Sequence, residues 1–140
     1  MTMTKSKLKG MLDSHFEWLR TKGNDKVSGE RLQLIGEDLS GADLRGCYLN
    51  RATLRGVNLD GANLEGAYLV GANLEGCNLK AANLRGVDMT CVNLMGANLF
   101  GADMGILKAS PFVYDALSAV MAAQIALKKT EIDWLGNVMG

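Results

Sequence analysis

The chain has 140 residues, and its 15 Lys and Arg side chains balance 15 Asp and Glu side chains. Because the charges balance, there is no global field that favours nucleic acid or an anionic membrane, and we expect direct binding to neither. No apolar stretch is long enough to span a bilayer, and the three cysteines show no CxxC or Cys/His pattern, which argues against a disulfide framework or a zinc site.

Residues 5–21 predict an amphipathic helix. The positions that follow helical spacing are Leu8, Met11, Leu12, His15, Phe16 and Leu19, and most of the charged residues lie on the other face. Together with a linker at residues 23–29, this helix forms an N-terminal segment, residues 1–31, that we expect to cap the region that follows. His15 is the only histidine, and with Trp18 it is a candidate for a ligand site, although a packing role is the better interpretation.

A repeat of five residues dominates the middle of the chain. From residue 34 to residue 104 a large aliphatic residue recurs at every fifth position, mostly with a small residue two positions before it and Gly two positions after it. A period of five fits neither a helix nor a regular strand. In extended backbone, residues two apart point to the same side, so each repeat supplies an inward small–large pair and a corner at Gly. One coil cannot bury such pairs, whereas stacked coils can.

The repeats resemble a known family. The stretch GADLRGCYLNRATLRGVNLDGANLEGAYLVGANLEG is similar to the A(D/N)LxG consensus of pentapeptide-repeat proteins, and the similarity extends over residues 34–106. The resemblance implies an all-β solenoid: a right-handed quadrilateral β-helix with twenty residues per coil and nearly four coils. We therefore expect a solenoid at residues 32–106 between an N-terminal helical cap and C-terminal helices at residues 107–140.

Some positions depart from the consensus. Glu37 occupies an inward small-residue position, where an unpaired charge is costly, so we expect either a distorted first coil or a partner from the N-terminal segment. Four residues replace the corner Gly, which predicts regular, less strained corners at those places. They are Arg51, Ala81, Cys91 and Ile106.

The C-terminal segment, residues 107–140, predicts a helix at 111–129, with Ser110 and Pro111 as its first-turn signals, followed by a short final helix. Apolar residues there and in the last repeats form a candidate dimer or cap surface: Met95, Phe100, Phe112, Leu117, Val120, Met121 and Trp134. Members of the family often dimerise at this end, so the resemblance implies a homodimer. Capping of the last coil is the open alternative.

We find no arrangement of residues that predicts an enzyme, a metal site or a cofactor. Cys47 and Cys77 are inward repeat positions and are expected to be inert, while Cys91 lies at a corner. The Asn and Asp residues of the repeat resemble a ladder of metal ligands, but a structural role in the repeat is the better interpretation. The cysteines fit a reduced, cytoplasmic compartment.

The outward charges alternate in sign between positions twenty apart, which predicts ion pairs from coil to coil. The predicted sets are Arg45, Glu65 and Arg85; Arg55 and Glu75; and Asp60 and Lys80. Residues 37–106 contain eight acidic and five basic side chains, so the solenoid is only slightly acidic.

One outward face is different. Tyr48 and Tyr68 replace the usual Asn or Asp one coil apart, with Val70 beside them, and these three residues form a candidate partner patch unless a terminal segment packs there. The sequence favours a non-enzymatic scaffold for a protein partner. The best known role in the family suggests an alternative, a DNA-mimicking modulator of a type II topoisomerase such as gyrase. A structural component of a larger assembly, such as a phage particle, is a third possibility.

Overall fold

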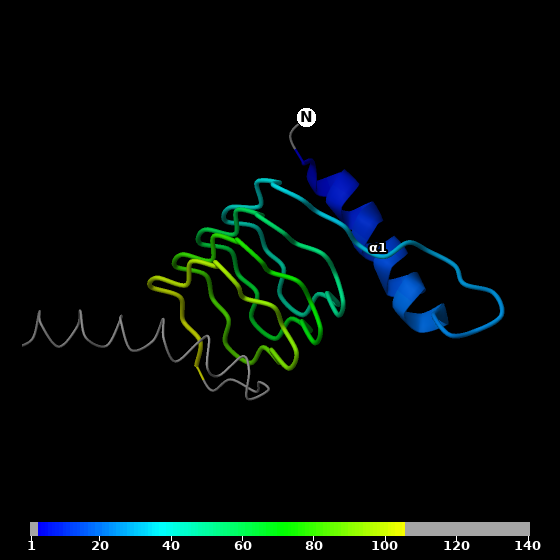
Figure 1. Cartoon of the computed structure of the whole chain (residues 1–140). Helices are drawn as coiled ribbons and strands as arrows, with labels where there is room; N and C mark the ends of the chain where they lie inside the picture. Colours follow the sequence, from blue (N-terminus) through cyan, green and yellow to red (C-terminus); the bar gives the residue numbers. More distant parts are fainter. Residues whose placement is uncertain (1–2, 106–140) are drawn as a thin grey trace, which may run out of the picture.

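The computed structural model describes residues 3–105, which form one helix followed by a stack of coils (Figure 1). The helix, α1 (Lys5–Thr21), has the bounds expected from the sequence and begins after Thr4, whose side chain accepts a hydrogen bond from the Lys7 N–H at 3.1 Å. In this part of the chain the β structure consists of isolated bridges between single residues. The C-terminal helices expected at residues 107–140 lie outside the described residues.

The coils are held together by a parallel ladder with a spacing of twenty residues. All eleven bridges join residues twenty positions apart, such as Asp43 and Asn63, and they fall into four columns. Two backbone bonds form each such bridge: the Leu44 N–H donates to the Asn63 carbonyl at 2.8 Å, and the Asn63 N–H donates to the Ala42 carbonyl at 2.9 Å. Each coil therefore contains four repeats of five residues, and its backbone polar groups are satisfied by the neighbouring coils.

The inward residues of the repeats form the core. Leu59, Leu64 and Ala62 are fully buried, and the same is true of nearly every inward position in the middle coils. Burying a Leu side chain contributes about 1.5–3 kcal/mol, so the column of leucines is the main source of stability. Cys77 lies in this core, its Sγ donates to the Leu54 carbonyl at 2.6 Å, and burial raises the pKa of its thiol to about 11. Burial and the raised pKa both favour the protonated thiol, which is a poor nucleophile.

Glu37 shows how the open end of the stack tolerates a charge. Its side chain is partly exposed, and its carbonyl still accepts the ladder bond from the Asn58 N–H at 2.9 Å. The first repeats are thus not distorted. Within the described residues Glu37 makes no salt bridge, so the partner expected from the N-terminal segment is not found. Because the stack begins here, water can reach the carboxylate.

The expectation of less strained corners where Gly is replaced is wrong. Arg51, Ala81 and Cys91 have φ angles of 59°, 56° and 59°, in the same left-handed region as the corner glycines. The ladder on both sides fixes the path of the chain at every corner, so a residue with a side chain must adopt the conformation that suits Gly. This conformation costs roughly 1–2 kcal/mol for an L-residue. Ile106, the fourth such residue, lies outside the described residues.

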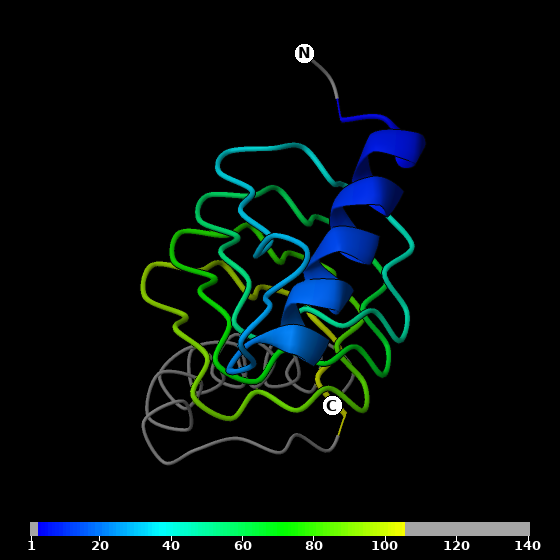
Figure 2. The same ribbon diagram turned by 90° about the vertical axis from the view of Figure 1, so that its right-hand side faces the viewer.

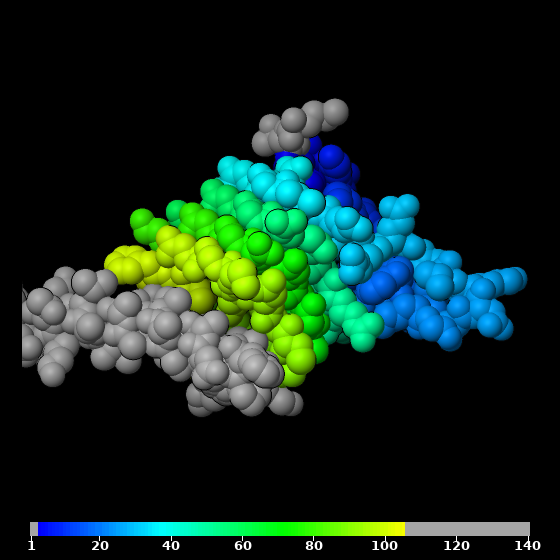
Figure 3. Space-filling model, in the orientation of Figure 1, coloured from blue at the N-terminus to red at the C-terminus, as the bar shows by residue number. Residues whose placement is uncertain are grey.

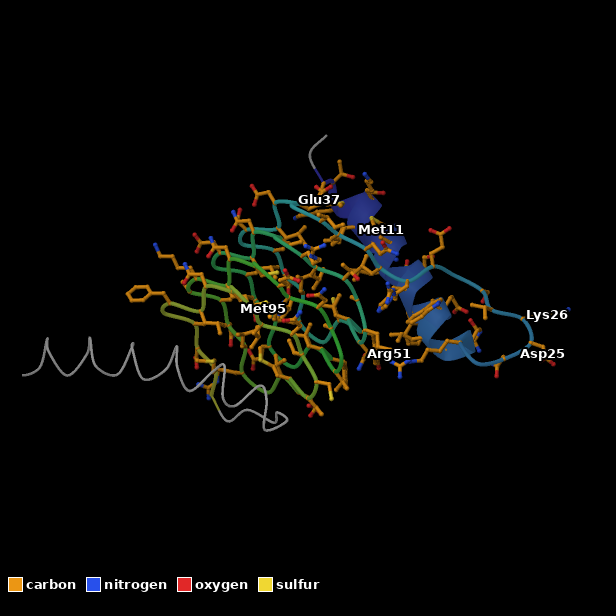
Figure 4. The ribbon with its side chains drawn as sticks, in the orientation of Figure 1. Met11, Asp25, Lys26, Glu37, Arg51 and Met95 are labelled. Carbon is orange, nitrogen blue, oxygen red and sulfur yellow. The ribbon has the colours of Figure 1, made fainter. Side chains whose placement is uncertain are left out.

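Helix α1 lies across the first coil, and the linker folds back along it (Figure 2). The Glu30 N–H donates to the Ser14 hydroxyl at 2.9 Å, and Gly29 lies so close to α1 that a side chain there would collide with the Ser14 carbonyl. Asp25 and Lys26 lie at the tip of the linker, away from the coils (Figure 4). In the space-filling view the coils follow one another in bands from the α1 end to the opposite end (Figure 3).

The corner conformation predicts that substitutions at two equivalent corners change the free energy of unfolding in opposite directions. Ala81 is exposed, and Ala81→Gly should raise the free energy of unfolding by about 0.5–1 kcal/mol because strain is relieved. Gly61 lies one coil earlier on the same corner with open space around it, and Gly61→Ala should lower that free energy by about 1 kcal/mol. Urea denaturation of both variants measures the effect. Equal signs for the two variants would contradict the account.

Candidate protein-binding surface

His15 joins α1 to the first coil. The ring is fully buried, its Nδ1 accepts a hydrogen bond from the Leu32 N–H at 2.9 Å, and its Nε2 lies 2.9 Å from the Asn50 carbonyl. Because a backbone N–H can only donate and a carbonyl can only accept, the proton must be on Nε2. The ring also stacks on Trp18, with 5.6 Å between centroids. These contacts support the packing role rather than a ligand site.

The histidine replaces part of a missing coil. At this corner the Arg51 N–H of the first coil donates to the Val70 carbonyl of the next coil at 2.9 Å, and Asn50 is the counterpart of Val70 twenty residues earlier. A regular solenoid would satisfy the Asn50 carbonyl from residue 31, but the chain has left the coil there. The Nε2–H of His15 supplies that bond instead. Burial, and to a smaller extent the nearby Arg31 and Lys22, lower the pKa of His15, which keeps the ring neutral.

An aromatic face runs from α1 down one side of the stack. The rings of Tyr48 and Tyr68 are nearly parallel, at 6°, with centroids 4.7 Å apart, and Phe16 of α1 contacts Tyr48 at 5.0 Å. The coil spacing of about 4.8 Å explains the separation of the two tyrosine rings. Both tyrosines are 46% exposed and Phe16 is 41% exposed. A terminal segment therefore does pack against this face, through the contact of Phe16 with Tyr48, but both tyrosines stay about half exposed.

The tyrosines break a local bonding rule of the repeat. Elsewhere the Asn or Asp before the central residue accepts a bond from the N–H two residues later; for example, the Asn63 Oδ1 accepts from the Glu65 N–H at 3.1 Å. This bond explains the Asn and Asp consensus without a metal ion. Tyr48 and Tyr68 cannot make it, so this bond does not account for them. Val70 is partly buried beside Tyr68 on this face.

Below Tyr68 the column returns to the usual chemistry. Asp88 bridges to Tyr68, and its Oδ1 accepts bonds from the Thr90 N–H at 3.0 Å and the Thr90 hydroxyl at 2.6 Å. The aromatic face, defined as Phe16, Tyr48, Tyr68 and Val70, is therefore confined to the half of the stack next to α1.

The charged faces pair only partly as predicted. Arg55 and Glu75 form the expected ion pair between coils, at 3.6 Å. Arg45, predicted to pair with Glu65, instead makes two bonds of 2.8 Å to Asp43, two residues before it on the same face. This interaction lowers the pKa of Asp43 to about 2. The nearby carboxylate is within reach without extending the side chain to the next coil.

Arg85 likewise pairs with a residue outside the predicted set. It contacts Asp103 at 3.4 Å, and Glu65 accepts a bond from the Asn83 amide at 3.3 Å. No ion pair joins Asp60 and Lys80 within residues 3–105. Three outward ion pairs therefore form on the described coils, and of these only Arg55–Glu75 is a predicted one.

Of the candidate dimer or cap residues, Met95 and Phe100 can be placed. They are 71% and 52% exposed near the last described coil, and Figure 4 shows Met95 on the part of the stack far from α1. The remaining candidates lie outside the described residues: Phe112, Leu117, Val120, Met121 and Trp134.

Two searches of residues 3–105 gave negative results. No group of three His, Cys, Asp or Glu side chains in this range is arranged to hold a metal ion. No helix in this range is long and apolar enough to cross a membrane.

The comparison with protein families agrees with the ladder. The family model for pentapeptide repeats matches residues 38–76 and 77–105, in eight copies. The chain belongs to the pentapeptide-repeat family. The matched residues are the ones that form the bridged coils, so the β-helix of this family accounts for the repeat region. A search of curated proteins gave no match.

Solved pentapeptide-repeat structures are similar to the chain. One, from the thylakoid lumen of Arabidopsis thaliana, is 36% identical over 56% of this chain and 59% of its own, with a TM-score of 0.47. Another, from the cyanobacterium Cyanothece 51142, is 34% identical over 64% of this chain and 67% of its own, with a TM-score of 0.45. The chain thus spans about three-fifths of the length of the first structure.

A more distant similarity is to trypsin-treated QnrB1, a plasmid-mediated fluoroquinolone resistance protein. It is 16% identical over 65% of this chain and 60% of its own, with a TM-score of 0.37.

The bonds of His15 predict a pH dependence of stability. The pKa of the folded state lies below the ordinary value of 6.5, so above pH 6.5 the ring is neutral in both states and the cap is fully formed. As the pH falls below 6.5 the unfolded chain takes up a proton first, and the free energy of unfolding decreases until the folded state is protonated too. Urea denaturation between pH 7.5 and 5 measures this decrease.

The control is His15→Phe, which fills the site without either bond. It leaves the Leu32 N–H and the Asn50 carbonyl unsatisfied, so it should be less stable by about 2–4 kcal/mol at pH 7.5. Since His15 is the only histidine, the decrease between pH 6.5 and the folded-state pKa should be absent from the variant. The same decrease in both proteins would show that His15 is not its source.

Proposed function

We propose that the chain is a non-enzymatic scaffold, a right-handed four-sided solenoid of nearly four coils that presents its aromatic face to a protein partner. The aromatic face is the observation that carries the proposal. Two tyrosines one coil apart give up a bond that stabilises most other repeats, and they remain 46% exposed. Tyrosine is enriched at protein interfaces because a large apolar ring and a polar hydroxyl reach the partner together.

The general role of the family and the low reactivity expected of the buried thiols both support a non-enzymatic scaffold. Pentapeptide-repeat proteins are generally structural or binding proteins. Burial raises the pKa of the thiols of both Cys47 and Cys77, which makes these cysteines poor nucleophiles. Neither forms a disulfide in the described residues, which fits the cytoplasmic location that we include in the proposal.

The paired charges favour the scaffold over the DNA mimic. A mimic of duplex DNA needs a sustained anionic surface in place of the phosphates. Here Arg55 neutralises Glu75 between coils, Arg45 neutralises Asp43 within a repeat, and Arg85 pairs with Asp103. Three of the acidic side chains on the described coils are therefore paired with an arginine, which interrupts a continuous anionic surface.

We also propose that the chain forms a homodimer at the end of the stack far from α1. Met95 and Phe100 expose large apolar surfaces there, on faces where earlier coils carry charged residues. Burial of those side chains against a second copy would remove that surface from water.

The aromatic face is tested by partner capture. The Tyr48→Ser/Tyr68→Ser double variant should stay folded, because both side chains are half exposed and the ladder bonds are made by the backbone. It should lose at least about 90% of the partner that wild type retains, which corresponds to the loss of a 1.4 kcal/mol contact. The matched control is Asp60→Ser/Lys80→Ser, two positions one coil apart on another face, which should retain the partner.

Two results would separate the alternatives. Capture that is unchanged in the tyrosine variant would remove the aromatic face from the proposal. If the DNA mimic were correct instead, the wild-type protein would inhibit gyrase supercoiling at micromolar concentration or protect the enzyme from a quinolone. The scaffold proposal expects neither effect.

The dimer is tested by light scattering on the full chain. We expect a mass of about two chains, falling to one chain in the Met95→Glu/Phe100→Glu variant, since buried charges without partners are costly. A mass of one chain for the wild type at micromolar concentration would exclude the homodimer.

A further inference from the structure

A groove lies between α1 and the first coil. It has a volume of about 580 Å³, within the range of about 300–1,000 Å³ that is typical of ligand sites. Its apolar lining comes from both elements: Leu8, Leu12 and Phe16 of α1, and Ala42, Cys47 and Tyr48 of the first coil. Four charged residues complete the lining: Lys5, Lys9, Asp13 and Asp43. Tyr68 and Val70 of the aromatic face do not line it.

The coil side of the groove is an open β edge. In the second coil, Tyr68 directs both backbone groups to the coil before it: its carbonyl accepts from the Leu49 N–H at 2.8 Å, and its N–H donates to the Cys47 carbonyl at 2.9 Å. Asn63 does the same. Their counterparts in the first coil are Asp43 and Tyr48, and both line the groove.

No coil precedes the first one, so these backbone groups have no ladder partner. Within residues 3–105, neither the N–H nor the carbonyl of Asp43 or Tyr48 makes a backbone hydrogen bond. An edge of this kind pairs readily with an extended chain. His15 satisfies the neighbouring corner at Asn50, but it does not reach Asp43 or Tyr48.

The charges of the groove leave an excess of positive charge at one end. Lys9 is paired with Asp13 at 2.7 Å, and Asp43 is paired with Arg45. Lys5 makes no salt bridge in the described part of the chain. It is also the first residue of α1, whose first turn contains no acidic residue, so the positive end of the helix dipole is not neutralised.

We propose that the groove binds a short extended peptide segment of another protein, with a carboxylate at the end next to Lys5. The peptide backbone pairs with the open edge at Asp43 and Tyr48, as an added strand does at a sheet edge. Its apolar side chains contact Leu8, Leu12 and Phe16, and its carboxylate neutralises Lys5 and the start of α1. This proposal goes beyond the scaffold function: the groove shares Phe16 and Tyr48 with the aromatic face but does not include Tyr68 or Val70.

The experiment starts from a probe that makes no assumption about the partner. A displayed library of random octapeptides with free carboxyl termini is selected on the full-length protein, and the enriched peptides are synthesised. We expect peptides with apolar residues at alternate positions and a carboxylate at one end. The absence of any enriched peptide would overturn the proposal.

Amide hydrogen exchange then locates the bound peptide. On binding, the backbone amides of Asp43 and Tyr48 should exchange at least about tenfold more slowly, because they gain hydrogen-bond partners. Peptide binding that leaves both amides unprotected would show that the open edge is not the site, and would overturn the proposal.

Charge variants test the carboxylate. Lys5→Glu should weaken peptide binding roughly fivefold or more, whereas Lys80→Glu, the same change on an exposed residue of another face, should not affect it. The selected peptide is also measured with an amidated terminus and with its acidic side chains changed to amides. Weaker binding of one of these two peptides identifies whether the carboxylate is the terminus or a side chain. Unchanged binding of both peptides contradicts the proposal.

Tyr68→Ser separates this proposal from the scaffold function. Tyr68 lies outside the groove, so the variant should bind the octapeptide normally even where it loses the protein partner. Loss of octapeptide binding in Tyr68→Ser would place the peptide on the aromatic face and contradict the groove.

Discussion

The backbone hydrogen bonds between successive coils, which pair residues twenty positions apart as parallel bridges, are the constraint on which the rest of this structure depends. Residues such as Asn63 use both backbone groups to bind the preceding coil, and the following coil is bound by their neighbours, such as Leu64. Because all the bridges are parallel and point the same way, the two ends of the stack are chemically different. The backbone groups at the outer edge of the first coil have no preceding coil to bond with, so they need another partner. Here His15 covers one corner, and the edge at Asp43 and Tyr48 stays open.

The same ladder separates residues that build the stack from residues that are available for recognition. The inward small–large pair fills the core, the corner must accept a positive φ, and Asn or Asp ties down the next N–H. These three requirements leave the residue after the central one without such a role in each repeat, and Asn or Asp is the usual residue at the position before the central one. Tyr48 and Tyr68 satisfy none of them, and they lie at the end where α1 and the open edge meet. Both proposed surfaces are therefore at the helix-capped end, on adjoining sides of Tyr48.

The sequence predicted those features that repeat or that depend on local spacing. Helix α1 follows from an apolar period of 3.6 residues and the stacking of coils from a period of five, whereas the twenty-residue spacing was implied by the resemblance to the family; the helix and the spacing are both present. The conformation of the corner at Ala81 was predicted wrongly. The replacement of Gly by Ala suggested an ordinary negative φ, but the ladder on both sides holds Ala81 in the left-handed region. The Arg45–Asp43 pair was not predicted because both Asp43 and Glu65 are near Arg45, and the sequence does not show which carboxylate it binds. The groove depends on the distance between α1 and the coil, for which the sequence contains no signal.

The central claim is that the first coil has an open edge which the histidine cap leaves unsatisfied. Amide hydrogen exchange on the free, full-length protein tests it most directly. The account predicts fast exchange at the amides of Asp43 and Tyr48 and slow exchange at Asn63 and Tyr68, their bonded counterparts one coil later. The Leu32 amide should also exchange slowly, because it donates to His15. Slow exchange at Asp43 and Tyr48 in the free protein would contradict the account, since it would show that the edge is already covered.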